Sequence, residues 1–132
     1  MNAWIAMWDR REPPHVLAAV RILVGLILVA DLIPVYTLDL VETLYAPAGE
    51  GGLARIQSRD VKPLLYRWMG VNVSTAWWSW GLAVGGAAAF SAGFMTRFAG
   101  LVFVLASANL AQIMPLSDRA IDTLLRNVVF LL

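Results

Sequence analysis

The sequence contains no cysteine and only one histidine. Without cysteine the chain has no disulfide framework and no thiolate to serve as nucleophile or metal ligand, and one histidine does not make a histidine-based metal site. Charge is also scarce, because Asp, Glu, Lys and Arg make up 14% of the residues, against about 25% in soluble domains. Ten basic and nine acidic residues leave a net charge of +1, so no basic field exists to attract nucleic acid. We therefore expect neither a metal nor a nucleic-acid partner.

Apolar residues are correspondingly abundant. They make up 60% of the chain, and the mean hydropathy is +0.70, whereas soluble domains are roughly 45–50% apolar. This composition excludes an ordinary water-soluble domain. It predicts an all-α integral membrane helical bundle with three full transmembrane helices and the start of a fourth, in contact with the lipid bilayer.

The first long apolar run covers residues 16–36, which as a helix rise about 32 Å and match the roughly 30 Å hydrocarbon core. A signal peptide is the alternative, although its apolar core is usually shorter, about 7–15 residues. The other predicted segments of this single membrane domain are an interfacial segment (1–14), an extramembrane loop with two short surface helices (37–70), a second span (71–94), a third span (98–115) and an incomplete fourth span (121–132). The fourth run rises only about 18 Å, so we expect the sequence to be the front part of a longer protein.

Ionisable residues inside transmembrane helices are costly and need a partner. In the predicted topology Asp31 and Arg126 fall at similar depth in one leaflet, and Asn109 and Gln112 share a helix face near it. Asp122 precedes Arg126 by four residues, which is a favourable spacing for a pair on one helix. We predict a polar cluster of these five residues that binds a lipid or quinone head group. The alternative is a charge pair that fixes the helix register. Arg21, near the other membrane surface, is expected to extend its side chain toward the head groups.

Small residues recur at every fourth position of the second span: Gly81, Gly85, Ala89 and Gly93. They line one helix face and permit close approach of a neighbouring helix. We expect this face to pack within the chain's own bundle, and a dimer interface is the alternative.

No pattern identifies a catalytic residue. The sequence has no Gly-rich phosphate loop, no Ser, His and acid set that spacing would nominate, and no carboxylate quartet for a di-metal centre. Catalytic residues therefore remain unknown, and no cofactor is evident.

Three stretches resemble the HTTM family, the membrane domain shared with vitamin K-dependent gamma-carboxylases. They are Pro13 to Pro34, with Val20-Arg21, Gly25 and Ala30-Asp31, then Ser91 to Leu110, and Asp122 to Leu132. The resemblance implies a multi-pass protein with a cytoplasmic N-terminus and further helices. In carboxylase members an intramembrane base deprotonates reduced vitamin K. This sequence departs from that pattern, because Ile121 aligns with the carboxylase histidine and the catalytic lysine would lie after Leu132.

The leading functional hypothesis is an HTTM-like multi-pass module of the bacterial inner membrane that binds a lipid or quinone. One alternative is a fragment of a carboxylase-like membrane enzyme, for which a vitamin K-like hydroquinone is implied by the resemblance alone. Another is a structural subunit that assembles with additional helices or a second copy through the small-residue face.

Overall fold

The computed structural model describes residues 14–54, 63–114 and 120–131, and these ranges are helical with short connections. Their one extended feature is an isolated bridge between Pro47 and Ala54. The all-α prediction is therefore confirmed for the described residues, whereas the predicted interfacial segment lies almost entirely outside them. The helices are α2 (Pro14–Thr37), α3 (Leu40–Tyr45), the 3-10 helix η1 (Ala48–Glu50), α4 (Leu64–Met69), α5 (Val73–Ala92), α6 (Thr96–Ile113) and α7 (Ala120–Leu131).

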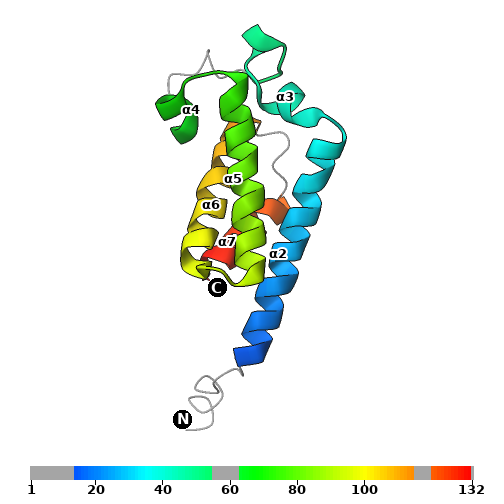
Figure 1. Cartoon of the computed structure of the whole chain (residues 1–132), viewed down its shortest axis with the longest axis vertical. Coiled ribbons are helices and arrows are strands. Elements are labelled where there is room, and N and C mark those ends of the chain that lie inside the picture. The colour runs from blue at the N-terminus through cyan, green and yellow to red at the C-terminus, as the bar shows by residue number, and fades with distance from the viewer. Residues whose placement is uncertain (1–13, 55–62, 115–119, 132) are drawn as a thin grey trace.

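Three long helices form the bundle, and successive helices run in opposite directions (Figure 1). Helix α5 packs against both α2 and α6, and the shorter α7 contacts α6 and α2. Helices α3 and α4 lie together at the end of the bundle where α2 finishes and α5 begins (Figure 1). The short helices expected between the first two spans are thus present as α3 and α4.

Small residues let α5 approach its neighbours closely. A Cβ added at Gly86 would lie 2.9 Å from the backbone nitrogen of Phe103 on α6, and a Cβ added at Gly25 on α2 would lie 2.5 Å from Cβ of Ser91. Both distances are too short for any side chain, so each glycine permits a backbone approach. Ala83 and Ala87 of α5 are fully buried beside Gly86. The interior of the bundle therefore depends on small residues of α5, as expected for helices that pack in lipid.

The packed face of α5 differs from the predicted one. Among the described residues nothing lies within 4 Å of a Cβ built at Gly81 or Gly85, and both positions are exposed. Ala89 is half-buried against the core, and Gly93 ends the helix with φ +79°. The second span carries small residues on two faces, and a four-residue repeat does not indicate which face turns inward.

Two described helices, His15–Thr37 and Thr96–Ile113, are long and apolar enough to cross a membrane. The prediction of three full spans and the start of a fourth is therefore not met by length and composition, because two of the described helices qualify. Helix α5 has 20 residues, but its Trp, Ser, Thr and Gly residues lower its hydropathy. Helix α7 has 12 residues, which rise only about 18 Å.

The end of the bundle that carries α3 and α4 is held together by side-chain hydrogen bonds. The Tyr66 hydroxyl of α4 donates to the Tyr45 carbonyl oxygen at 2.8 Å, and the Asn72 side chain caps α5 by accepting from the Thr75 amide at 2.9 Å. Burial raises the pKa of the Tyr66 phenol well above its usual value, so this group stays a hydrogen-bond donor at neutral pH.

Gly86→Ala and Gly85→Ala, at neighbouring positions of α5, should have opposite effects on stability. The new methyl of Gly86→Ala meets the Phe103 backbone, and overpacking of this kind costs about 1–3 kcal/mol of unfolding free energy. Gly85→Ala enters open space and removes the flexibility of a helical glycine, which is worth about 0.5–1 kcal/mol. Unfolding in mixed detergent micelles measures both. Equal stability of the two variants would contradict the packing described for α5.

Candidate ligand-binding site

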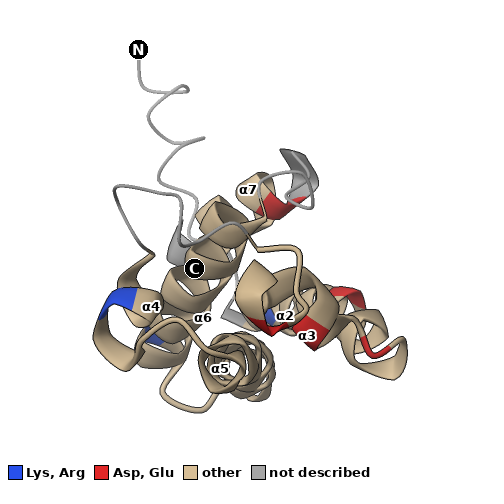
Figure 2. Ribbon diagram, turned by 90° about the horizontal axis from the view of Figure 1, so that it is seen from above, with Lys and Arg blue, Asp and Glu red and all other residues tan. Residues whose placement is uncertain are grey.

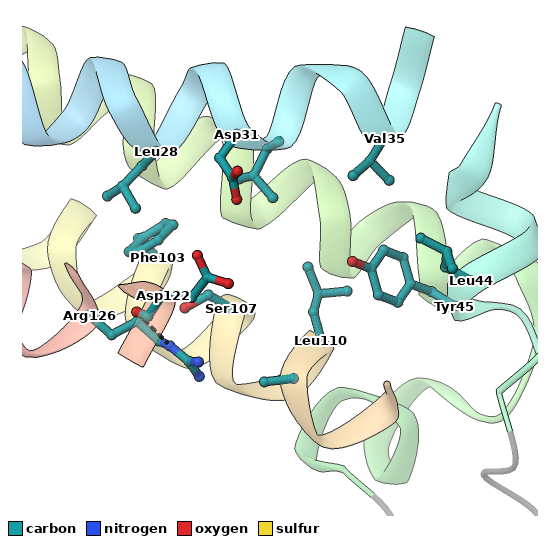
Figure 3. Close-up of a pocket in the computed structure, with 12 residues that line it drawn as sticks. Leu28, Asp31, Val35, Leu44, Tyr45, Phe103, Ser107, Leu110, Asp122 and Arg126 are labelled. Carbon is teal, nitrogen blue, oxygen red and sulfur yellow. Dashed lines mark hydrogen bonds between the residues drawn. The ribbon is translucent and has the colours of Figure 1, made fainter. Parts of the chain in front are cut away.

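A cavity of about 240 Å³ lies between α2, α6 and α7 and is closed at one end by α3 (Figure 3). Most of its wall is apolar. Its lining residues are Leu28, Asp31, Leu32 and Val35 from α2, Leu44 and Tyr45 from α3, Phe103, Ser107, Leu110 and Ala111 from α6, and Asp122 and Arg126 from α7.

Charged groups are concentrated at one part of this wall. Figure 3 shows the carboxylates of Asp31 and Asp122 pointing into the cavity from α2 and α7. Arg126 folds along its own helix, where its Nε donates to the backbone oxygen of Asp122 at 3.3 Å. Two carboxylates and one guanidinium therefore share the cavity, so the formal charge of its lining is −1 with all three ionised.

Helical spacing explains why these side chains meet. Asp31 follows Leu28 by three residues and precedes Val35 by four, so all three lie on the face of α2 toward α6 and α7. Phe103, Ser107 and Ala111 repeat every four residues along α6. Asp122 lies in the first turn of α7, where the positive end of the helix dipole stabilises a carboxylate.

The structure brings three of the five predicted cluster residues together. Asp31, Asp122 and Arg126 line the cavity, whereas Asn109 and Gln112 are not among the lining residues. The direct contact between Asp31 and Arg126 stays a prediction.

The side chain of Asn109 is hydrogen-bonded to neighbouring protein groups and does not line the cavity. It is 3% exposed, its Nδ2 donates to Ser79 Oγ at 3.2 Å, and its Oδ1 accepts from the backbone nitrogen of Leu65 at 3.2 Å. Asn109 therefore faces α5 and α4. It follows the cavity residue Ser107 by two positions, about 200° around a helix, so two residues at similar depth on α6 face different sides of the helix. Gln112 is exposed.

Sequence reasoning missed Tyr45 and Ser107 as cavity residues. One feature of the sequence could have indicated Ser107: it is a hydroxyl in the middle of an apolar span, four residues before Ala111. Tyr45 ends the short surface helix α3, and no sequence pattern indicates that this helix folds over the end of the cavity.

Arg21 lies at the opposite end of the bundle. Its Nη2 is 2.8 Å from the position that a Cβ at Gly93 would take, at the C-terminal end of α5. A guanidinium there is favoured by the negative end of the helix dipole. Within the described ranges its Nε is the one buried side-chain nitrogen or oxygen without a hydrogen-bond partner. The side chain extends toward the nearer end of the bundle, where α5 turns into α6.

A resident metal has no evident ligand set here. The described residues contain no group of three or more His, Cys, Asp or Glu side chains placed to hold an ion.

Comparison with protein-family models, with curated proteins and with solved structures finds no match to this chain. The similarity to the HTTM family therefore remains a prediction from the sequence.

Asn109→Leu should lower the free energy of unfolding by about 1–3 kcal/mol, because it leaves the partly buried Leu65 amide without its acceptor. Asn127→Leu makes the same change at an exposed position of α7 and serves as the matched control. Unfolding in mixed micelles measures both. If Asn109→Leu matched the control in stability, Asn109 would not have the structural role that its hydrogen bonds indicate.

Proposed function

We propose that this chain is a multi-pass membrane module that binds the small head group of a lipid or quinone in the cavity between α2, α6 and α7. The observation that carries the proposal is the cavity itself: an apolar wall with carboxylates, a guanidinium and a hydroxyl gathered on part of it. An apolar pocket with a few convergent polar groups is the usual form of a small-molecule site.

The cavity volume supports a small head group. At about 240 Å³ it lies below the roughly 300–1,000 Å³ of pockets for drug-sized ligands. A dry protein cavity of about 150 Å³ accommodates a benzene ring. One ring, or one compact polar head, therefore fits this space, and an alkyl tail would extend along the apolar helix faces outside it.

The antiparallel order of the helices supports a third span. If α2 and α6 both cross the membrane in the same direction, α5 must cross between them to join their opposite ends (Figure 1). Its polar side chains are compatible with lipid because they are bonded internally. Ser79 Oγ donates to the Thr75 carbonyl at 2.8 Å, and Thr75 Oγ1 donates to the Gly70 carbonyl at 2.9 Å. Helix α7 then packs against α6 and α2 as the start of a fourth span.

The position of the cavity within the proposed membrane suits a head group. Asp31 precedes the end of α2 at Thr37 by six residues, about 9 Å along the helix axis. The charged part of the cavity would then lie just inside one leaflet. A ligand placed there keeps its polar part near the membrane surface and its apolar part in hydrocarbon.

Three of the residues that carry the HTTM resemblance have defined contacts. Gly25 permits the approach of Ser91, Arg21 lies against Gly93, and Asp31 lines the cavity. We further propose, on the sequence resemblance alone, that the module is HTTM-like and lies in the bacterial inner membrane.

The binding test uses ubiquinone-1 and dihexanoyl-phosphatidylethanolamine as separate probes in calorimetric titrations of the detergent-solubilised chain. We expect saturable binding of at least one probe with a Kd below about 1 mM, which corresponds to about −4.1 kcal/mol. Ser107→Phe places a ring in the cavity and should weaken that binding at least tenfold.

The matched control is Leu101→Phe, which adds a ring on the exposed face of the same helix and should leave the affinity unchanged. Failure of both probes to bind would overturn the proposal. Equal affinities of the Ser107→Phe variant and the wild type would overturn it as well.

A further inference from the structure

Three aromatic rings meet where α2 ends and α5 begins, outside the cavity lining. The Tyr36 and Trp80 rings are stacked with centroids 5.5 Å apart. The Trp77 ring stands edge-on to both, at 6.2 Å from Tyr36 and 5.9 Å from Trp80. We refer to Tyr36, Trp77 and Trp80 as the aromatic triad.

A carboxylate is attached to this triad. Glu42 Oε1 of α3 accepts a hydrogen bond from Trp77 Nε1 at 3.0 Å, and Glu42 is exposed. The segment that contains Glu42 is acidic, because residues 37–54 contain three acidic residues and no basic residue. Figure 2 shows acidic residues on α3 beside the end of α2. Glu42 therefore places a carboxylate beside the triad with which a cation can pair.

The triad is fixed in position before any ligand arrives. Trp80 Nε1 donates to the Leu32 carbonyl oxygen at 3.3 Å, and Trp77 is held by Glu42. Tyr36 remains 56% exposed, so one ring surface stays open while the rings behind it are anchored. Preorganised groups lose little conformational entropy on binding.

We propose that the aromatic triad with Glu42 binds the alkylammonium group of a phospholipid head, of the choline or ethanolamine type. The faces of Trp and Tyr rings attract cations within about 6 Å of the ring centroid, and quaternary ammonium ligands are recognised in this way. Tyr36 lies in the last turn of the candidate span His15–Thr37, at the level of the head groups. The inference rests on the proposed membrane placement of α2 and does not depend on the cavity.

Other exposed tryptophans lack these features. Trp68 and Trp78 are 83% and 59% exposed, and within the described ranges neither has a ring partner or a hydrogen bond to a carboxylate. They fit the general enrichment of tryptophan at membrane surfaces. The triad differs from them because it combines fixed ring faces with a negative charge.

The test follows the indole N–H resonances of the full chain in an uncharged detergent. The probes are tetramethylammonium chloride and dihexanoyl-phosphocholine, and sodium chloride at equal ionic strength is the control. We expect saturable shifts of the Trp77 resonance with both probes and none with sodium. Tyr36→Leu and Glu42→Gln should each weaken binding about two- to fivefold, whereas Tyr36→Phe keeps a ring and retains the affinity.

Trp78→Leu removes an exposed indole outside the triad and should bind both probes like the wild type. Equal shifts with sodium, or wild-type affinity in both Tyr36→Leu and Glu42→Gln, would overturn the proposal. Binding of tetramethylammonium without phosphocholine would show a site for free cations and overturn the phospholipid assignment. Ser107→Phe should leave these titrations unchanged, so a failure of the cavity proposal is distinguishable from a failure of this one.

Discussion

A polar group that is buried away from water must find its hydrogen-bond partner within the protein, because the apolar side chains around it offer none. The part of this bundle next to α4 follows that constraint. Asn109 joins Ser79 of α5 to the Leu65 amide of α4, and Ser79 in turn donates to the backbone of its own helix. This network lets a helix rich in Ser, Thr and Trp serve as the middle element between two strongly apolar helices.

The tight contacts between helices and the cavity arise from facing residues of different size. Where α5 presents Gly86, Ala83 and Ala87, the helices approach until little space remains. At the start of α6 a Cβ added at Gly100 would lie 3.3 Å from Val129 of α7, so that contact is also tight. Toward the N-terminus of α7 the facing residues are longer and charged, and the helices leave the partly open cavity between them.

Both proposed sites lie near the end of α2, on different sides of it. Val35 lines the cavity, whereas Tyr36, one residue later and about 100° around the helix, belongs to the aromatic triad. Helix α3 contributes to both, since Tyr45 covers the cavity and Glu42 bonds Trp77. A short surface helix thus links an apolar pocket inside the bundle with an acidic, aromatic surface at its edge.

The sequence by itself determined the all-α class and the approximate ranges of the helices, because hydropathy and helical rise act locally along the chain. It also indicated that Asp31 and Arg126 lie at similar depth, since depth depends only on the distance from a helix end. Tertiary structure decided the rotation of each helix. Rotation turned Asn109 away from the cavity, brought Ser107 into it, and directed the Gly86 face of α5 inward in place of the Gly81 and Gly85 face. These choices depend on how side chains of separate helices fit together, and no single-helix pattern encodes that fit.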